Sequence, residues 1–503
     1  MTMKKGFIGL FLAFILSLVI GAPNPLEATT FSVFDRPLSL FGQLSQSVQY
    51  GWQDEYDTYQ GINQALTTAI FEGDYKPSNR LKLYGMTTLN YNLVYPIYSD
   101  DSTWKRRQFD KSDEMAFDDE YWRILREIHA TWTPGNNMVR VGKQIVSWGE
   151  MTGFRLLDQL NPTDAIRGPS DIEFETTIVP TWMVRYDQGL PLTSAWVSNV
   201  NFQVVWDPIV DNDIYTRGAG SGNEVWGIWA PYIEVPAPFP PGTLFGSTNL
   251  RLEKPEEWSD SRIGVRLQAL LGEALVSFNF LYGRDIGPLT HTIGISPPTI
   301  IDGQLTAHFD QAGYFPIRRM IGGMFARELG FIPRIGGISA PFLRLEWAYL
   351  FNSTFYNLTN AEFEEHDDMR IAGSLEMSVP IRWLNPNQKF KFSGQYYLRH
   401  ISDIEDGYEN RVFSTEGAAE KYNHVTTISV STNYWLSRLI PMVAWNHLWN
   451  SDSYLVKPTM TYLHSHKWSF VLGATFFGGN KEGQGMQIYD HKDYVSFKAQ
   501  YKF

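Results

Sequence analysis

The last eleven residues of this 503-residue chain constrain its fold more than any other stretch. They read Asp-Tyr-Val-Ser-Phe-Lys-Ala-Gln-Tyr-Lys-Phe, with an apolar or aromatic side chain at every second place. One parity holds Val495, Phe497, Ala499, Tyr501 and Phe503, and the other holds Ser496, Lys498, Gln500 and Lys502. Because successive side chains of a strand point to opposite faces, this pattern predicts a strand with one apolar and one polar face.

The aromatic carboxy-terminal residue makes the prediction more specific. The stretch resembles the terminal strand by which outer-membrane barrels are recognised and closed. The resemblance implies an apolar face toward lipid, a polar face toward a wet lumen and matching strands along the chain. It also implies two kinds of partner: outer-membrane lipid with lipopolysaccharide, and a barrel-assembly machinery that binds Val495, Phe497, Tyr501 and Phe503.

The amino terminus predicts export. Lys4 and Lys5 precede an apolar run that ends at Ala22, and small residues and prolines follow, as in a secretory signal. Cleavage after Ala28 is preferred, since cleavage after Ala22 would leave a proline at the new amino terminus. The alternative is a membrane anchor, for which the run is short of the roughly 20 residues of a span. Residues 1–28 are therefore predicted to be a signal peptide, and residues 29–503 a single domain.

Composition supports the same class of protein. Tryptophan (17) and tyrosine (26) are abundant while only 19% of residues are charged, as aromatic girdles and a lipid-facing band require. After Ala28 no stretch approaches the roughly 18 apolar residues of a membrane helix, so a chain in the membrane would be a closed barrel. The chain has no cysteine, which excludes disulfides and thiolate metal sites. Its net charge of -12 argues against nucleic acid as a partner.

Alternating segments along the chain predict an all-β, transmembrane, antiparallel up-and-down β-barrel of about 16–18 strands with long extracellular loops. The predicted strands are 38–52, 62–75, 81–95, 121–133, 138–148, 182–187, 195–207, 262–271, 274–285, 319–329, 342–352, 369–380, 389–401, 422–436, 442–450, 454–463, 467–477 and 493–503. Short turns (at Lys76, Pro134, Gly189, Gly272, Asn385, Ser437 and Ser465) alternate with mostly long connections, as periplasmic turns alternate with outer loops. Arg126 falls on the lipid parity, so it lies near an interface or the register of its strand differs.

The stretch Val139–Gly168 is the most distinctive in the chain. It contains Gly-Lys-Gln-Ile-Val-Ser-Trp-Gly-Glu, predicted as a strand, and then Asn-Pro-Thr-Asp in a loop. This combination resembles the outer-membrane proteins grouped as domain of unknown function family 1302, with a specific match over Gly142–Asp164. The resemblance implies a large outer-membrane barrel and brings no established activity. One short helical turn is expected at Leu156–Leu160.

Residues 149–179 are predicted to form a loop that folds into the lumen and constricts it, as a long loop does in porins. The charged residues selected as constriction residues of this loop are Glu150, Arg155, Asp158, Asp164 and Arg167. The predicted pore-lining residues, chosen by strand parity, are Arg140, Gln144, Arg262, Arg266, Arg344, Glu346, Lys391 and Arg399. Basic residues outnumber acidic ones among them, which favours an anion-preferring or mixed pore. The alternative is a loop that caps the barrel from outside, with its charges in a structural network.

Other clusters of polar residues are weaker candidates for a metal-binding or catalytic site. His464-Ser465-His466 lies in a predicted tight turn and offers too few converging ligands for a metal. The carboxylates of 364–368 and 118–120, expected in outer loops, suit oxygen-loving cations or lipopolysaccharide-bridged ions, or are simply solvated. No Ser/His/Asp set and no phosphate-cradling glycine loop is evident, so neither a catalytic site, a metal nor a cofactor is predicted.

The sequence therefore predicts a porin-like channel, monomeric or trimeric, for passive passage of small polar or anionic solutes. One alternative is a barrel that moves lipid-like or sterol-like molecules, supported by aromatic residues assigned to the lumen parity (Tyr84, Phe278, Phe280, Phe342 and Tyr397). A second is a sheath for a periplasmic or cytochrome partner, whose haem would come from another polypeptide since Cys-x-x-Cys-His is absent. A third, an outer-membrane lipase or protease, would need a catalytic set at the rim.

Overall fold

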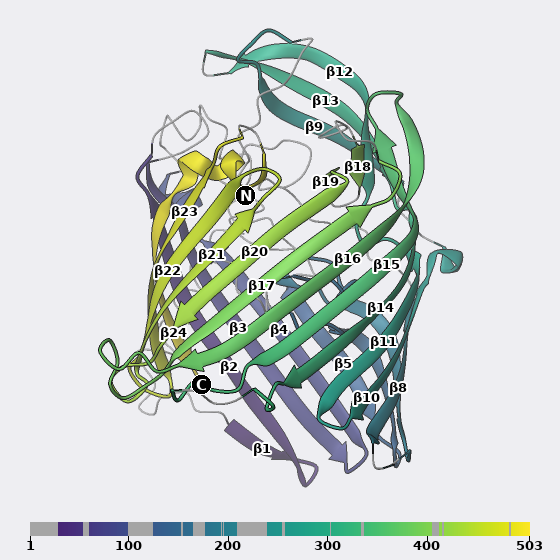
Figure 1. Ribbon diagram of the computed structural model, residues 1–503, viewed down its shortest axis with the longest axis vertical. Helices are drawn as coiled ribbons and strands as arrows, with labels where there is room; N and C mark the ends of the chain where they lie inside the picture. Colours follow the sequence, from purple (N-terminus) through teal and green to yellow (C-terminus); the bar gives the residue numbers. More distant parts are fainter. Residues whose placement is uncertain are drawn as a thin grey trace.

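The computed structural model describes residues 29–53, 60–98, 124–151, 154–163, 177–192, 194, 196–208, 239–253, 257–301, 303–332, 336–404, 412–414, 417–481 and 484–503. The predicted signal peptide, the carboxylates of 118–120, and the loop residues Asp164 and Arg167 lie outside this part of the chain. The described residues build a closed antiparallel barrel of 18 strands (Figure 1).

The barrel strands are β2 (Arg36–Gly51), β3 (Gly61–Ser78), β4 (Leu81–Asn92), β5 (Leu125–Trp132), β6 (Asn137–Gln144), β7 (Thr181–Leu190), β8 (Val197–Asp207), β10 (Arg262–Leu271), β11 (Ala274–Arg284), β14 (Ile317–Glu328), β15 (Phe342–Asn357), β16 (Glu362–Val379), β17 (Phe390–Ile401), β20 (Tyr422–Ser431), β21 (Leu439–Leu448), β22 (Ser453–Leu463), β23 (Trp468–Gly479) and β24 (Tyr494–Lys502). Each strand pairs with the next one in this order, and β24 closes the ring on β2, from Lys502 opposite Gln43 to Tyr494 opposite Gly51. The predicted fold class and strand number are confirmed.

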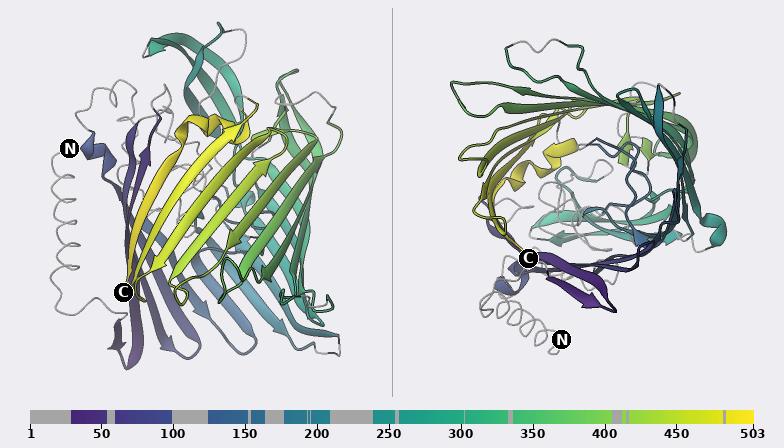
Figure 2. Two further views of the ribbon diagram at one scale, coloured as in Figure 1. Left: turned by 60° about the vertical axis from the view of Figure 1, so that its left-hand side comes forward. Right: turned by 90° about the horizontal axis from the view of Figure 1, so that it is seen from below.

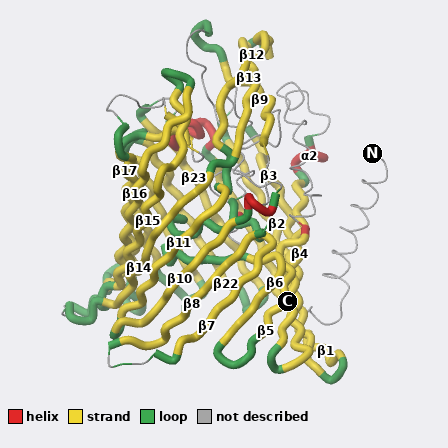
Figure 3. Tube along the Cα trace, turned by 90° about the vertical axis from the view of Figure 1, so that its right-hand side faces the viewer, coloured by secondary structure: helices red, strands yellow, loops and turns green. Residues whose placement is uncertain are grey.

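The outer face of the ring is apolar. Exposed side chains on the outward parity include Leu40, Phe71, Leu83, Ile128, Trp132, Val141, Ile263, Leu267, Phe278, Phe280, Leu345, Trp347, Ile371, Val443, Met460, Leu472, Val495 and Phe497. A closed ring satisfies every backbone group of its strands, and an apolar outside suits hydrocarbon, so this is a barrel of the outer membrane. The short turns and the carboxyl terminus share one end, which is the periplasmic end by the rule for this class (Figure 3).

The structure decides two parity assignments made from sequence: for Arg126 the second alternative, a different register, is correct, and the lumen assignment of Phe278 and Phe280 is wrong. Arg126 lies inside, 3% exposed, because a bulge in β5 opposite Met86 and Thr87 inserts one residue and turns its side chain inward. Phe278 and Phe280 lie outside instead of in the lumen, since they pair across β10 and β11 with outward Leu267 and Val265. The case for an apolar lumen loses these two aromatic rings.

Further elements lie at the ends of the barrel. A three-stranded sheet of β9 (Leu244–Glu253), β12 (Leu289–Ile301) and β13 (Gln304–Tyr314) stands beyond the extracellular mouth (Figures 1 and 3). The ring of His291 in β12 packs on Tyr356 and Phe363 of the long β15–β16 hairpin, with centroids 5.1 Å apart in each pair. The carboxylates of 364–368 belong to β16 in this hairpin and do not form the separate loop expected from sequence. β1 (Thr29–Val33) pairs with the start of β2 at the periplasmic end.

Helical structure is sparse and short in the described residues. It includes α2 (Val94–Ile97), η3 (Trp258–Asp260) and η4 (Gly485–Lys492). None of the helices in the described ranges is both long and apolar enough to cross a membrane. The end-on view of Figure 2 shows η4, drawn in yellow, inside the ring. Met486 and Tyr489 of η4 pack on an apolar cluster of Val94, Leu455, Phe477 and Tyr494, which holds the helix at the mouth.

The contact between η4 and the wall should depend on pH through Asp493. Burial raises the pKa of its carboxyl to about 6, although the Phe477 N–H, 2.8 Å from Oδ1, favours the charged form. Because the folded-state pKa exceeds the usual 3.8, protonation stabilises the docked state as pH falls from about 7 to about 4. We expect amide hydrogen exchange in residues 485–492, corrected for intrinsic rate, to be slower at about pH 5 than at about pH 7.5. Asp493→Asn should remove the difference; a difference that persists in this variant would exclude Asp493 as its origin.

Candidate functional site: a lumen narrowed by an inward segment

The chain that follows β6 runs along the inner wall of the barrel, and residues 145–163 are here called the inward segment. Its two ends are joined by Asn161, whose side chain is fully buried. Asn161 Oδ1 accepts from the Val146 N–H at 2.8 Å, and Nδ2 donates to the carbonyls of Gln144 and Val179, both at 3.0 Å. One amide side chain therefore closes the loop, and the side chain belongs to the Asn-Pro pair singled out in the sequence.

Two carboxylates hold the turn that leads into the inward segment. Asp158 Oδ1 accepts from the Gly149 N–H at 2.9 Å and from the Ser147 hydroxyl at 3.0 Å. Glu346 of β15, 1% exposed, accepts from the Met151 N–H at 3.0 Å. A Cβ on Gly149 would lie 3.0 Å from Asp158 Oδ2 and 3.2 Å from each Glu346 oxygen. A side chain at position 149 would therefore crowd both carboxylates, which would have to shift by a few tenths of an ångström.

An apolar face of the inward segment packs on the barrel wall. Its buried members are Val146, Trp148, Met151, Leu156, Leu157 and Leu160, which contact Met183, Val205, Leu281, Met320, Met324, Ala348 and Leu350. Trp148 fits over Gly264, where an added Cβ would lie 2.5 Å from the indole ring, and its Nε1 donates to Gln203 Oε1 at 2.6 Å. The expected helical turn at Leu156–Leu160 is not formed; these residues follow a bent, non-helical course. The described segment thus fills part of the lumen with packed side chains.

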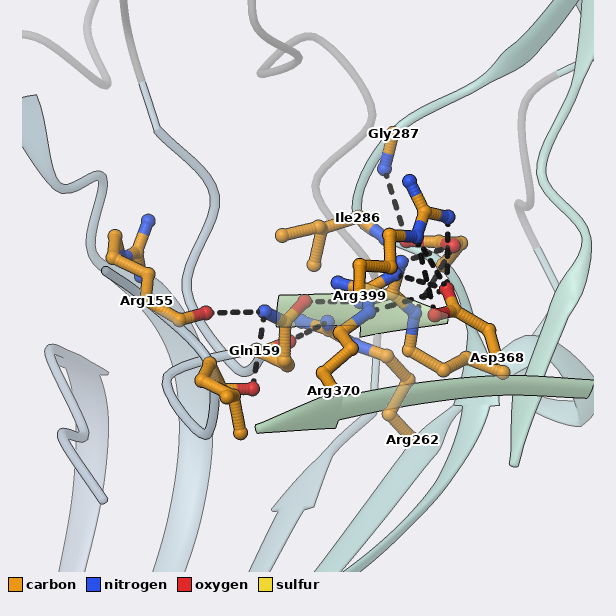
Figure 4. A network of polar contacts seen from close by, with 11 residues as sticks. Arg155, Gln159, Arg262, Ile286, Gly287, Asp368, Arg370 and Arg399 are labelled. Carbon is orange, nitrogen blue, oxygen red and sulfur yellow. Dashed lines mark hydrogen bonds and ion pairs between the residues drawn. The ribbon is translucent and has the colours of Figure 1, made fainter. Parts of the chain in front are cut away.

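Buried arginines from distant strands lie along the wall beside this segment, and two of them, Arg262 and Arg318, bind it (Figure 4). Arg262 of β10 pairs with Asp207 of β8, Nε to Oδ2 at 3.1 Å, and its Nη2 donates to the Leu160 carbonyl at 2.6 Å. Arg318 of β14 pairs with Asp285 at 2.7 Å and also donates to the Gln159 side chain. Asp368 of β16 accepts from Arg370 at 2.7 Å and from Arg399 of β17 at 2.8 Å. These side chains are all buried, so they form a charged belt inside the wall.

The sequence-predicted site residues therefore fall into two groups. Gln144, Arg262, Glu346 and Arg399 are at most 5% exposed and bind protein groups rather than open water. Arg140, Arg266, Arg344 and Lys391 are also on the inward parity and keep part of their surface exposed. Of the loop residues, Glu150 is exposed, whereas Arg155 binds the carbonyls of Asp158 and Asn161. Gln159, Asp207, Arg318 and Arg370 complete the site and were not selected from sequence, since only folding shows that they meet. Asn161 was noted in the Asn-Pro motif but was not assigned a role.

The opposite wall has a different chemistry. The inward faces of β20–β24 and β2 carry hydroxyl and amide side chains, among them Thr427, Ser429, Asn446, Thr459, Thr475, Ser496, Gln500, Gln43, Ser45 and Ser47. Lys457, Lys498 and Lys502 are the charged residues on these faces, and within the described strands no Asp or Glu accompanies them. A wall of neutral polar groups and lysines thus faces the wall that carries the inward segment.

Comparison with known proteins identifies the family to which the chain belongs. The family described as "Protein of unknown function (DUF1302)" matches residues 128–503, which is most of the sequence. The chain belongs to this family. The match covers the distinctive stretch of the inward segment together with every strand from β6 to β24. No curated protein matches the sequence.

Solved structures of similar overall shape are large outer-membrane proteins. They include OccAB3 of Acinetobacter baumannii, with 10% identity and a TM-score of 0.49, covering 94% of this chain and 100% of that one. OpdK of Pseudomonas aeruginosa, solved with vanillate, has 8% identity and a TM-score of 0.46, covering 93% and 98%. OmpF of Salmonella typhi, in complex with daunomycin, has 8% identity and a TM-score of 0.41, covering 94% and 100%. At such identities the likeness concerns shape and not site residues.

Proposed function

We propose that this DUF1302 barrel is a passive channel for small polar solutes with a preference for anions. The observation that carries the proposal is the residue content of the lumen face of β20–β24 and β2, where Lys457, Lys498 and Lys502 stand among hydroxyl and amide groups. A barrel of this strand number encloses enough space for an aqueous path. The sign of the charges along such a path decides which ions it admits.

The wall beneath the inward segment contributes charges of both signs. Arg140 and Arg185 face each other across β6 and β7, and Arg185 is paired with Asp187 at 2.7 Å. Arg266 lies beside the segment, with Nη1 3.5 Å from the Ser147 carbonyl. Because exposed Glu150 lies on the same side, this wall is mixed, and the anion preference comes mainly from the opposite wall.

The inner aromatic residues do not favour an apolar cargo. Tyr397 stacks on Phe154 of the inward segment at 5.2 Å, and Tyr84 stacks on His129 and donates to Glu72. Phe342 lies under the guanidinium of Arg344, 4.5 Å from its ring centroid. Since each ring already packs against protein, none forms an open apolar track.

The proposal is tested by reversal potential in planar bilayers under a potassium chloride gradient. We expect an anion-selective potential for the purified barrel, and a fall of roughly twofold or more in the chloride-to-potassium permeability ratio for Lys498→Glu and Lys457→Glu. Lys389→Glu makes the same charge change on an exposed periplasmic turn and should have a much smaller effect. A folded barrel that passes no current would overturn the channel, and a cation-selective wild type would overturn the preference.

The terminal strand retains its proposed role in assembly. Phe503 pairs with Gly42 through both backbone hydrogen bonds, at 2.9 and 3.0 Å, so the last residue closes the ring. Val495 and Phe497 are exposed on the outer face, while Tyr501 packs against Trp468. We propose that the assembly machinery binds this strand before closure, when all of its outward side chains are accessible.

A further inference from the structure

Large apolar side chains are exposed on three consecutive periplasmic turns, beyond the ends of the strands. They are Phe331 and Ile332 after β14, Trp383 and Leu384 after β16, and Trp435 and Leu436 after β20, with exposed fractions from 37% for Ile332 to 96% for Leu436. Removing one such side chain from water is worth about 1.5–3 kcal/mol. Because several of them gather on neighbouring turns, they indicate an interaction surface.

Hydrogen bonds join the three turns into one unit. The described residues of 329–341, 380–389 and 431–439 form this unit, which is here called the platform. Asn385, 2% exposed, donates from Nδ2 to the Thr432 hydroxyl and to the Asn433 carbonyl, both at 2.9 Å. The Ser378 N–H donates to the Ser339 hydroxyl at 2.8 Å, which ties the first turn to the end of β16. The apolar side chains are therefore presented from a fixed frame.

The β20–β21 turn holds its exposed side chains in an unusual backbone conformation. Trp435, Leu436 and Ser437 have φ angles of 50°, 56° and 66°, all in the left-handed region. A residue with a side chain pays roughly 1–2 kcal/mol there, so a run of three persists only where the surrounding structure enforces it. The backbones of Tyr434 and Leu439 enforce it by bonding each other at 2.7 and 3.2 Å. Such strain is a reason to seek a function for Trp435 and Leu436.

The position of the platform favours a membrane as its partner. Loops at the periplasmic end of β14–β17 project sideways, away from the barrel wall (Figures 2 and 3). The outward face of the wall is still apolar near these turns, as exposed Leu345 of β15 and Leu375 of β16 show. The apolar side chains of the platform are therefore continuous with the lipid-facing surface of the barrel.

The charge of the platform favours anionic phospholipid. Residues 380–389 and 431–439 contain Arg382, Lys389 and Arg438 and no Asp or Glu, in a chain whose net charge is -12. All three basic side chains are exposed. A basic residue near an anionic leaflet gains about 1 kcal/mol, and tryptophan prefers the region between headgroups and acyl chains. Exposed tryptophans beside basic residues thus complement such a leaflet in both charge and polarity.

We propose that the platform binds the periplasmic leaflet of the outer membrane through its anionic phospholipids. The apolar side chains enter the region between headgroups and acyl chains, and Arg382, Lys389 and Arg438 contact phosphates. This contact holds one side of the periplasmic rim to the leaflet. Aromatic girdles lie on the outward faces of strands, whereas here the contact is made by turns. Binding to the leaflet goes beyond the channel function and does not require conduction.

The absence of cysteine allows a single fluorescent label on the full-length barrel. Leu384→Cys and Leu436→Cys, each labelled with nitrobenzoxadiazole, are placed in vesicles of phosphatidylethanolamine and phosphatidylglycerol. We expect blue-shifted emission and roughly twofold or greater quenching by lipids that carry a nitroxide on the upper acyl chain. His466→Cys is the matched control, because it lies exposed on the polar β22–β23 turn at the same end. Its label should emit as in water and be quenched little.

Gel mobility before and after heating shows that each labelled barrel is folded. Replacing Arg382, Lys389 and Arg438 together by glutamine should reduce quenching at position 436 in vesicles that contain phosphatidylglycerol, and unchanged quenching would refute the role of the basic residues. Water-like labels at both 384 and 436, or quenching no greater than at 466, would overturn the proposal. Labels shielded in native outer membranes but not in phospholipid vesicles would assign the platform to a protein partner instead. An electrically silent barrel would leave these results unaffected.

Discussion

Arg262→Ala is expected to lower the free energy of unfolding by about 3–5 kcal/mol, the range for removing one partner of a buried ion pair. Arg262 is 2% exposed and Asp207 is fully buried, so the aspartate would lose the guanidinium that lies against its buried charge. The carbonyls of Gln159 and Leu160 would also lose the donor that Arg262 supplies. The variant should therefore weaken both the wall and the attachment of the inward segment.

Urea titration of the barrel in lipid vesicles, with folding followed by tryptophan fluorescence, measures this change. The double variant Arg262→Ala with Asp207→Ala should recover part of the loss, because it leaves no unpaired charge. Arg344→Ala is the comparison, since its partner Glu376 and the arginine itself keep about a fifth of their side-chain surface exposed (18% and 20%). It should cost about 1 kcal/mol or less. Equal losses for Arg262→Ala and Arg344→Ala would contradict the structural role of the belt.

Asn161→Ala is expected to release the inward segment and raise single-channel conductance by roughly twofold, because a segment that fills part of the lumen would move. The substitution leaves the Val146 N–H and the carbonyls of Gln144 and Val179 without their partner. Each buried group without a partner costs about 1–3 kcal/mol, so the loss of Asn161 at three groups together should weaken the docking of the segment.

Planar-bilayer recordings would report the change as larger and noisier openings, and protease cleavage within residues 145–163 would report the released segment. Asn387→Ala, on an exposed periplasmic turn, is the control and should behave as the wild type. Wild-type conductance together with a protected segment would mean that the apolar contacts of Trp148 and Leu157 suffice to hold it. The assignment of Asn161 as the closing residue would then be abandoned.

The alternation of apolar and polar residues predicted the barrel strands, and each place where it failed has a local cause. The β24 pattern placed Val495 and Phe497 outside and Lys498 inside, as observed. The bulge at Arg126 could not be predicted from the sequence. One inserted residue turns the neighbouring side chains to the opposite face of the strand, and the amino-acid composition does not reveal the insertion. The pair β12 and β13 was not predicted. Both faces of β12 are largely exposed and Pro297-Pro298 interrupts it, so the alternation that a membrane wall imposes is absent.

Less of the candidate site than of the barrel wall could be predicted from the sequence. Parity correctly marked Arg262, Glu346 and Arg399 as inward, but it carries no information on which inward side chains meet. Asp368 and Arg399 are 31 residues apart, and Arg318 and Gln159 are 159 apart. These distances along the chain are bridged only when the ring closes and the inward segment docks. The expectation of a hydrated ring of charges in the loop did not foresee the apolar face that packs on the wall.

The sequence by itself determined the two-faced strands, their number and order, and the compartment, because these follow from a period of two and from turn chemistry. Only the tertiary structure decided how the lumen is built. It brought Asn161 to both ends of the inward segment and placed Trp148 over Gly264. It also gathered Arg318, Arg370 and Arg399 around one pocket. The physical reason is that strand parity is a local property, whereas contacts across the lumen depend on the register and closure of the whole ring.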